Sequence, residues 1–372
     1  MRIAMLISTP FPPEEGIGYY VYNLSKKLIE RGYEVTVITR GGFSNIKHFY
    51  LDGIEVYKPQ FFPVYPFHVH IHKLFVERFL KELNRDFDII HIHSPLSPYL
   101  THSKIPTVLT VHTSLLEDIK HHQFYNLNAI GQKLTTYLTG YSLMKKLIEC
   151  SNVVTTVSSS VAREIQEYYG RNPIVVGNGV DEREFYPSDD RKGGYVLYVG
   201  RLDYRKGLID LIKVAQILKD NKKPIKILIV GTGPLYKYIK AMIRKYDLDN
   251  IELTGYVPRK RLLWLYRNAE IFTFPSHYEG LPTVILEAMA CGLPVVASDI
   301  PAHRDIIIHG YNGLLSRRGS PDSIARNILT LTENEKLQRK LGKNARKTIE
   351  NKFTWDKICK KFEKIYKQAI IN

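Results

Sequence analysis

Apolar residues occur along the chain in two alternating patterns. Short continuous apolar runs are typical of buried strands, and segments in which apolar residues recur every three or four positions are typical of amphipathic helices. Residues 2–8 form the first run, and Val21, Leu24 and Leu28 mark the periodic segment that follows it. Because the two patterns alternate, we expect an α/β fold with mainly parallel sheets that helices cover on both faces.

The alternation occurs twice, on either side of a polar, turn-rich region between residues 176 and 194. In the first half, the predicted strands are residues 2–8, 34–39, 88–93, 107–111 and 152–157. In the second half, they are residues 195–199, 226–230, 251–253, 271–274 and 294–297. We therefore expect two α/β domains, residues 1–187 and 188–353, followed by an amphipathic helix over residues 354–372.

Length and composition agree with two globular domains. A chain of 372 residues can bury two cores of ordinary size, and 44% apolar with 24% charged residues is typical of a globular protein. No apolar run reaches the roughly 20 residues that span a bilayer, and residues 2–8 are too short for a signal peptide. Three widely spaced cysteines form neither a disulfide framework nor a metal pattern, so a cytoplasmic location is expected.

The formal net charge of +16 indicates a polyanionic partner: nucleic acid, anionic lipid head groups or a phosphorylated ligand. The sequence contains no zinc-finger or RNA-binding motif, so we expect no nucleic-acid partner. The alternatives that remain are a merely solvated basic surface and attraction to an anionic membrane.

Two glutamates with E-x7-E spacing, Glu279 and Glu287, follow the predicted strand 271–274. A helix is expected to begin near Pro282 and to stop at Gly292, which places Glu287 in its second turn. The free amides of the first turn suit a phosphate. The alternative is that Glu279 caps the helix and Glu287 is a solvated surface residue.

A second group of candidates lies in glycine-bearing loops that follow strands. Gly200, Arg201 and Lys206 follow strand 195–199, and Arg and Lys beside glycines suit a diphosphate, although both cations can also simply be solvated. Gly231 follows strand 226–230 and is expected to line the same pocket. Gly16 and Gly18 follow the first strand, but this loop lacks the full G-x-G-x-x-G of a nicotinamide dehydrogenase.

Histidines at strand ends are candidates because ligands bind at that edge of a doubly wound sheet. His112 and His93 are the two candidates for a functional role. A structural role is the alternative for both, and it is favoured for His91. His68, His70 and His72 are expected on a surface strand or loop rather than in a metal site.

The string from Glu279 to Glu287, with its flanking residues, resembles the signature of retaining GT-B glycosyltransferases, in particular family 4 (glycosyl transferases group 1). The resemblance implies two Rossmann-like domains that face each other across a cleft, with the acceptor on the first and a nucleotide-diphosphate sugar mostly on the second. It also implies that helix 354–372 crosses back to the first domain.

The resemblance assigns roles to individual residues. Glu279 meets the donor sugar hydroxyls, Glu287 meets the ribose, and Arg201 with Lys206 grips the diphosphate. His112 reaches the sugar from the first domain and shapes the reaction centre, and His93 is expected to face the acceptor. The remaining donor contacts implied are Gly16, Gly18, Gly200, Gly231, Val257, Gly280, Leu281, Pro282 and Thr283. The family commonly has two adjacent glycines in its first loop, and here Glu15 replaces the first of them.

We therefore predict a retaining, metal-independent hexosyltransferase of class EC 2.4 that needs no cofactor beyond its nucleotide-sugar substrate. The expected acceptor is a glycan, glycolipid or phospholipid at the inner face of the membrane, since the charge favours an anionic surface. The alternatives are a non-catalytic module that binds polyanions or nucleic acid, and a GT-B nucleotide-sugar epimerase. The donor base stays open among UDP, GDP and ADP.

Overall fold

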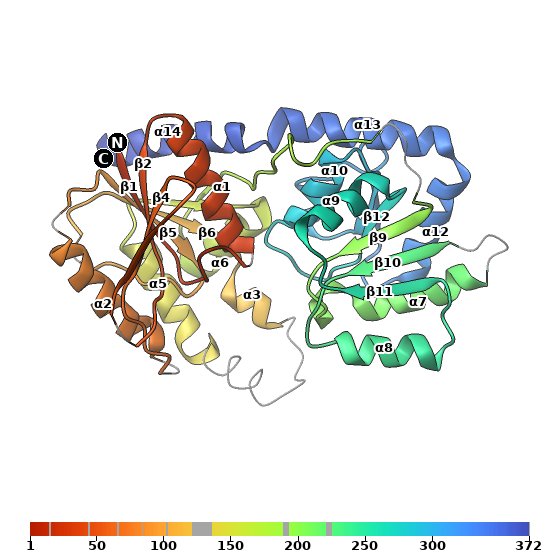
Figure 1. The fold of residues 1–372 in the computed structure, drawn as a ribbon, viewed down its shortest axis with the longest axis horizontal. Helices are drawn as coiled ribbons and strands as arrows, with labels where there is room; N and C mark the ends of the chain where they lie inside the picture. The colour runs from red at the N-terminus through yellow and green to blue at the C-terminus, as the bar shows by residue number, and fades with distance from the viewer. Residues whose placement is uncertain are drawn as a thin grey trace. The chain divides into compact units, whose positions relative to one another are not determined.

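The computed structural model describes residues 1–372 except 15, 44, 65–66, 84, 102, 121–135, 189–192, 221–224 and 372. The chain forms two compact units, each an α/β sheet with helices around it (Figure 1). The first unit contains the described residues up to Gly179 and the last helix, from Trp355. The second unit contains the described residues of Val180–Thr354.

The sheet of the first unit has eight strands among the described residues, in the order β3-β4-β2-β1-β5-β6-β7-β8. Their bounds are β1 Arg2–Leu6, β2 Glu34–Ile38, β3 Lys47–Leu51, β4 Ile54–Lys58, β5 Ile89–Ser94, β6 Thr107–Val111, β7 Val153–Thr156 and β8 Ile174–Val175. All neighbours pair in parallel except β3 with β4. The predicted strands are therefore present, and β3, β4 and β8 were not expected.

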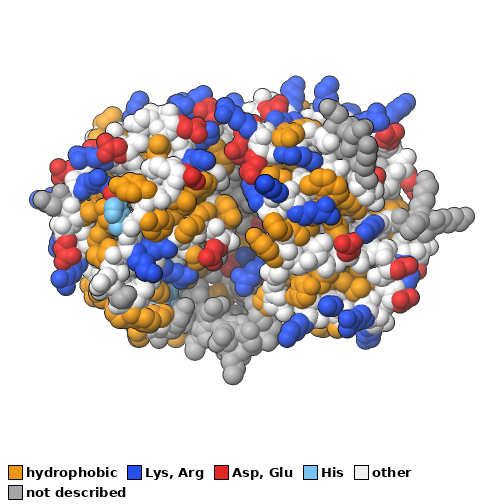
Figure 2. Space-filling model, in the orientation of Figure 1, with side chains coloured by type: hydrophobic (Ala, Val, Ile, Leu, Met, Phe, Trp, Pro, Cys, Tyr) orange, Lys and Arg blue, Asp and Glu red, His pale blue; other side chains and the backbone are white. Residues whose placement is uncertain are grey.

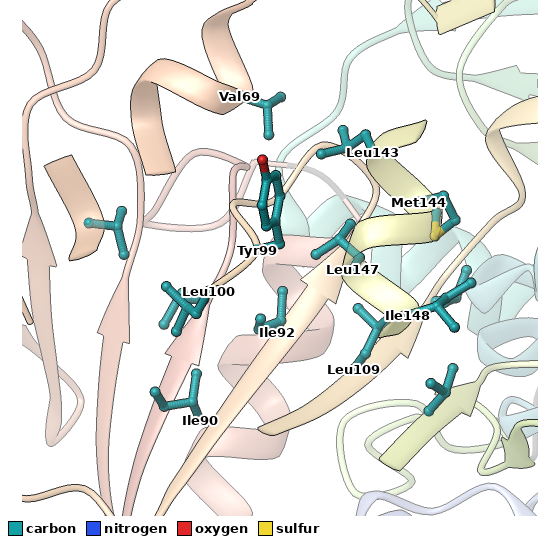
Figure 3. Close-up of a cluster of buried hydrophobic side chains, with 14 of the residues drawn as sticks. Val69, Ile90, Ile92, Tyr99, Leu100, Leu109, Leu143, Met144, Leu147 and Ile148 are labelled. Atoms are coloured by element: carbon teal, nitrogen blue, oxygen red, sulfur yellow. The ribbon is translucent and has the colours of Figure 1, made fainter. Parts of the chain in front are cut away.

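The helices of this unit include α1 Gly16–Glu30, α2 His68–Glu82, α3 Leu115–Lys120, α5 Tyr141–Glu149, α6 Ser159–Tyr169 and a π-helix, η1, Thr136–Gly140. Helices α2 and α5 bury apolar residues against β5 and β6, where Val69, Ile92, Leu109 and Met144 meet in one cluster (Figure 3). The prediction that His68, His70 and His72 lie on a surface strand or loop is wrong. They lie on α2, and His68 and His72 are buried.

The last helix, α14 Trp355–Ile371, packs against α1, β5 and β6 of the first unit (Figure 1). Its apolar face is the predicted one, because Ile358, Phe362 and Ile365 are buried. Polar contacts add to this packing: Arg31, just after α1, pairs with Glu363 at 2.8 Å, and Lys361 donates to the carbonyl of Val176 at 2.6 Å.

The sheet of the second unit is parallel throughout, in the order β11-β10-β9-β12-β13-β14 over the described residues. The bounds are β9 Tyr195–Val199, β10 Lys226–Val230, β11 Ile251–Gly255, β12 Ile271–Phe274, β13 Val295–Ser298 and β14 Leu314–Ser316, of which β14 was not expected. Its helices are η2 Tyr204–Lys206, α7 Leu208–Lys219, α8 Tyr236–Lys245, α9 Arg259–Asn268, α10 Thr283–Ala290, α11 Pro301–Arg304, α12 Pro321–Glu333 and α13 Glu335–Lys352.

The boundary predicted near residue 187 differs from the division in the structure, which falls between Gly179 and Val180. The segment after Val180 packs with the second unit, where the ring of Phe185 meets that of Tyr266 with centroids 5.6 Å apart. Arg346 of α13 also donates to the carbonyl of Phe185 at 2.8 Å. Turn residues in the sequence mark a polar surface segment, but they do not show which core it packs on.

Strand order reverses once in each sheet, between β1 and β5 in the first unit and between β9 and β12 in the second. In open parallel sheets, ligands bind outside the carboxyl ends of the strands at this switch point, because the loops on either side diverge there. The loops after β9 and β12 carry Arg201, Lys206 and Glu279, so the fold places these candidates at one such point.

Candidate active site

The loops after β9 and β12 lock together through their backbones. Gly207 has φ +72°, and a Cβ at this position would collide with the carbonyl oxygen of Pro275. The amide of His277 donates to the carbonyl of Arg205 at 2.7 Å, which ties the same two loops together. Glycine at position 207 therefore lets the two candidate loops approach each other.

The loop after β10 packs on the loop after β9 in the same way. Gly231 has φ +138°, and a Cβ there would collide with the carbonyl oxygen of Gly200. The amide of Leu202 donates to the carbonyl of Thr232 at 2.9 Å. Gly231 was expected to line the pocket, and its close neighbour in the structure is the Gly200 backbone.

Lys206 and Glu279 form an ion pair between these loops. Lys206 Nζ lies 2.6 and 2.8 Å from the two carboxylate oxygens of Glu279, and the two side chains are 14% and 7% exposed. Burial acts to raise the pKa of Glu279, but Lys206 and Arg205 outweigh it, so this pKa lies below its ordinary value. The residue at the N-cap position of helix α10 is Pro282, which makes no side-chain cap hydrogen bond. Glu279 lies three residues before it and is not the cap residue.

Glu287 lies in the second turn of α10, as predicted, and it is half-buried rather than solvated. The hydroxyl of Tyr266 donates to it at 2.8 Å. Burial raises the pKa of Glu287, although the positive charge of Arg259 and the Tyr266 hydrogen bond oppose the rise. The carboxylate is thus oriented by one donor and keeps further acceptor positions for hydroxyl groups.

Between the two glutamates the backbone leads into the first turn of α10. Leu281 and Pro282 are buried, and Gly280 and Thr283 are half-buried. First-turn amides of a helix have no acceptor within the helix, and the helix dipole favours negative charge at this end. The segment is therefore suited to a phosphate or to sugar oxygens.

Arg201 and Val257 lie farther out. The Arg201 side chain is 63% exposed, with Nε 3.8 Å from Asp203, and is therefore more open to a ligand than that of Lys206, which is 14% exposed. Val257 follows β11, two strands away from β9, and is half-buried. The structure therefore brings Lys206 and Glu279 into contact, while Arg201 extends from the loop that carries Lys206.

Sequence reasoning missed His303 on the short helix α11, after β13. Its ring is fully buried, its Nδ1 lies 2.7 Å from the carbonyl oxygen of Ser298, and its ring centroid lies 5.9 Å from that of Phe274. Burial lowers the pKa of His303 to about 4, while the neighbouring Glu279 opposes the shift. Its position just beyond a strand end, the feature that singled out His112, was the available signal.

In the first unit, the loop after β1 leads into α1. Gly16 is the first residue of α1 and is exposed, and no neighbouring atom lies within 4 Å of where its Cβ would be. Gly18 is buried, and a Cβ there would lie 3.2 Å from Pro13. Gly16 thus leaves room for a ligand, whereas Gly18 packs within the loop. Glu15 lies outside the described residues.

The strand-end histidines separate into two groups. His93 and His112 form a pair, with His93 Nδ1 3.1 Å from His112 Nε2. His91 has both ring nitrogens engaged, by the hydroxyl of Tyr366 at 2.8 Å and that of Thr110 at 2.7 Å. His91 is therefore structural, as favoured. His93, expected to face the acceptor, is only 1% exposed and reaches His112 instead.

Within the described residues, no group of three His, Cys, Asp or Glu side chains is arranged to hold a metal ion. Asp88, which directly precedes β5, accepts a hydrogen bond from the amide of Arg2 at 2.6 Å. None of the helices in the described part of the chain combines the length and the apolar character needed to cross a bilayer.

Comparisons with known proteins agree with this geometry. Residues 181–348 match the family model for glycosyl transferases group 1, and residues 15–184 match the model for glycosyltransferase family 4. The chain is 28% identical over 402 residues to the uncharacterized glycosyltransferase MJ1607 of Methanocaldococcus jannaschii, with 100% of this chain and 99% of that protein covered.

It is 27% identical over 394 residues to a phosphatidyl-myo-inositol mannosyltransferase of Mycolicibacterium smegmatis, with 98% and 93% covered. The solved structure of sucrose-phosphate synthase from Thermosynechococcus elongatus superposes with a TM-score of 0.84 at 21% identity and covers 100% of this chain and 99% of that one.

The two parallel α/β units therefore define a protein of the GT-B fold. The two family models together extend from residue 15 to residue 348. The chain belongs to the glycosyl transferases group 1, glycosyltransferase family 4, and is a nucleotide-sugar glycosyltransferase.

Proposed function

We propose that the protein is a retaining hexosyltransferase that binds its nucleotide-diphosphate sugar at the carboxyl edge of the second unit, without a metal ion. The Lys206–Glu279 pair is the observation that carries this proposal. It holds a lysine charge and a carboxylate side by side at the switch point of the sheet. A diphosphate needs positive charge, and sugar hydroxyls need an acceptor.

The leaving group of the reaction is a nucleoside diphosphate, whose negative charge grows as the glycosidic bond to phosphate breaks. Lys206, the exposed Arg201 and the first-turn amides of α10 can stabilise that charge. Each such contact contributes about 2–4 kcal/mol to barrier lowering in comparable sites. These groups supply positive charge from the protein itself, which supports a metal-independent reaction.

The retaining outcome is proposed through a front-face route, in which the leaving phosphate oxygen helps to deprotonate the acceptor hydroxyl. Both carboxylate oxygens of Glu279 are engaged by Lys206, which makes this group a poor nucleophile. A double displacement would require a free carboxylate beneath the sugar. Glu279 is therefore assigned to orienting sugar hydroxyls and Glu287 to the ribose.

The acceptor is proposed to be a lipid-linked or phospholipid hydroxyl at an anionic membrane surface. Lys and Arg side chains are distributed over the visible face of both units, in keeping with the formal net charge of +16 (Figure 2). On the first unit, Phe43, Val64, Phe67 and Leu74 are each more than half exposed. The relative from Mycolicibacterium smegmatis is named a phosphatidyl-myo-inositol mannosyltransferase, and this name supports the proposal of a phospholipid acceptor.

The test of the donor site is calorimetric titration with UDP, GDP and ADP in the presence of a chelator. We expect one nucleotide to bind with micromolar affinity in wild type, and the affinity to fall in Lys206→Ala and Glu287→Gln. A matched control is Lys336→Ala, an exposed lysine on α13. Binding that requires a divalent ion would contradict the metal-independent part of the proposal.

The acceptor is tested by sedimentation with vesicles of neutral lipid alone and with added anionic lipid. We expect binding only to the anionic vesicles, weakened by salt and by Phe43→Ser or Phe67→Ser but not by Tyr238→Ser on the second unit. Salt-sensitive binding to DNA or RNA without any nucleotide affinity would favour the polyanion-binding alternative instead. Interconversion of free nucleotide sugars without an acceptor would favour an epimerase.

A further inference from the structure

The histidines at the carboxyl ends of β5 and β6 form a directly hydrogen-bonded pair of imidazole rings. His93 Nδ1 lies 3.1 Å from His112 Nε2, and the two ring planes are inclined at 26° with centroids 5.4 Å apart. A hydrogen bond between two neutral imidazoles needs one ring to donate and the other to accept. The direction therefore determines which nitrogen of His112 carries a proton.

The burial of His93 determines that direction. His93 is 1% exposed, and among the described residues its Nε2 has no hydrogen-bond partner. If His93 accepted at Nδ1, its proton would sit on Nε2 as a buried N–H without an acceptor. Unpaired buried N–H groups are rare, and an unsatisfied acceptor is the more tolerated defect. His93 consequently carries its proton on Nδ1 and donates it to His112 Nε2.

Neighbouring groups hold the two rings in place. The ring of Tyr20, from α1, meets His112 edge to face at a centroid distance of 4.7 Å, and its hydroxyl donates to the carbonyl of Gly177 at 3.2 Å. His91 lies 4.0 Å from His93 between ring centroids and is itself fixed by Tyr366 and Thr110.

Both members of the pair are kept neutral. Burial lowers the pKa of His112 to about 3, and burial together with His91 and His112 lowers that of His93 well below its ordinary value. Because neither ring is charged at neutral pH, each ring carries one proton, and what remains to be decided is which ring donates the hydrogen bond.

We propose that His93 is a positioning residue that holds His112 in the tautomer protonated on Nδ1, so that His112 offers the donor sugar a hydrogen-bond donor and not a proton acceptor. The consequence for the sugar rests on the proposed function and on the role that the family resemblance implies for His112, a contact with the donor sugar. The tautomer itself is a property of the free protein.

Nuclear magnetic resonance of the full chain labelled with ¹⁵N-histidine tests the tautomer without any substrate. The His112 signals, identified by their loss in His112→Asn, are expected to show a protonated Nδ1 and an unprotonated Nε2 at pH 7. A protonated Nε2 on His112 overturns the proposal, whether or not the enzyme is active.

Two substitutions of His93 then separate positioning from mere packing. The amide of His93→Asn can still donate to His112, and His93→Phe fills the space but cannot donate. We expect His93→Phe to give a mixture of His112 tautomers and to lower kcat by about tenfold, with KM and nucleotide affinity within about twofold of wild type. His93→Asn should restore the single tautomer and most of kcat.

The outcomes remain separable. Equal tautomer populations and equal kcat in wild type, His93→Phe and His93→Asn would overturn the positioning role. Failure of wild type to transfer sugar would instead count against the proposed function, while the spectra still decide the tautomer. Thermal unfolding of each variant, and nucleotide binding at the second unit, verify that a loss of kcat does not reflect a loss of fold.

Discussion

Lys206, in the loop after β9, bonds both carboxylate oxygens of Glu279, in the neighbouring loop after β12, at 2.6 and 2.8 Å. Lys206 Nζ also lies 5.5 Å from the ring centroid of Phe274, at the end of β12. The pair is therefore enclosed by the protein, and each charge depends on the other for compensation.

Removal of one partner is expected to destabilise the protein more than removal of both. Lys206→Met leaves a buried carboxylate without its cation, which typically costs about 3–5 kcal/mol, whereas Lys206→Met combined with Glu279→Gln leaves no buried charge. The double variant should therefore be more stable than Lys206→Met alone. Urea unfolding of both single variants, the double variant and wild type measures the coupling.

Additive losses in this cycle would show that the pair is solvated and contributes little. Lys226→Met with Glu252→Gln provides the matched comparison, because that pair is at 2.6 Å with both side chains about half exposed. There we expect coupling of less than about 1 kcal/mol.

Glu287 is expected to act on the nucleoside and not on the diphosphate. Glu287→Gln should weaken the binding of a nucleoside diphosphate by about tenfold or more, since hydrogen bonds to a charged acceptor are lost. The binding of inorganic pyrophosphate should change little. Tyr266→Phe removes the hydroxyl that orients Glu287 at 2.8 Å and should have the same selective effect, but smaller. Calorimetry with both ligands measures this, and equal loss of pyrophosphate binding would contradict the ribose assignment.

The close contact between the loops after β9 and β12 predicts that one added methyl group at position 207 lowers the free energy of unfolding by an unusually large amount. Gly207→Ala meets both a left-handed backbone, φ +72°, and the Pro275 carbonyl, so we expect a loss of about 2–5 kcal/mol. Gly310→Ala has nearly the same φ, +75°, but open space around the Cβ, and should cost about 1–2 kcal/mol. Denaturant unfolding of the two variants isolates the collision, and equal losses would show that the loops can separate.

The burial of His72 on α2 leads us to expect that the folded protein loses stability in acid. Burial lowers its pKa from 6.5 to about 4, with Arg40 contributing, so between these values the unfolded chain binds the proton and the folded chain does not. Stability from this group is therefore full above pH 6.5 and falls as the pH drops toward 4, by up to about 1.4 kcal/mol per pH unit.

His72→Leu removes this titration from a site where, among the described residues, neither ring nitrogen has a hydrogen-bond partner. We expect the variant to lose less stability than wild type between pH 7 and pH 4.5, measured as the free energy of unfolding at each pH. His309→Leu, at an exposed position, controls for the loss of one histidine. Parallel pH profiles for wild type and His72→Leu would show that His72 is not buried in solution.

Much of the fold can be predicted from the sequence, because strand periodicity and helix periodicity are local properties of the chain. The predicted strands of both halves are present, as is the buried face of α14 with Ile358, Phe362 and Ile365. The sequence singles out Glu279 and Glu287 by their E-x7-E spacing. It singles out Lys206 as a cation beside glycines in a loop that follows a strand. The edge strands β3, β8 and β14 were missed, since such strands carry too little apolar pattern, and the internal strand β4 was missed as well.

The tertiary structure decided what those residues touch. Strand order brings distant segments of the chain together, and periodicity does not encode strand order. This arrangement creates the contacts of Lys206 with Glu279, of Tyr266 with Glu287 and of the Gly207 backbone with Pro275. The same holds for His93, whose sequence position at a strand end suggested an acceptor contact. Its burial beside His112 follows from the parallel pairing of β5 with β6, a long-range contact that only the folded sheet creates.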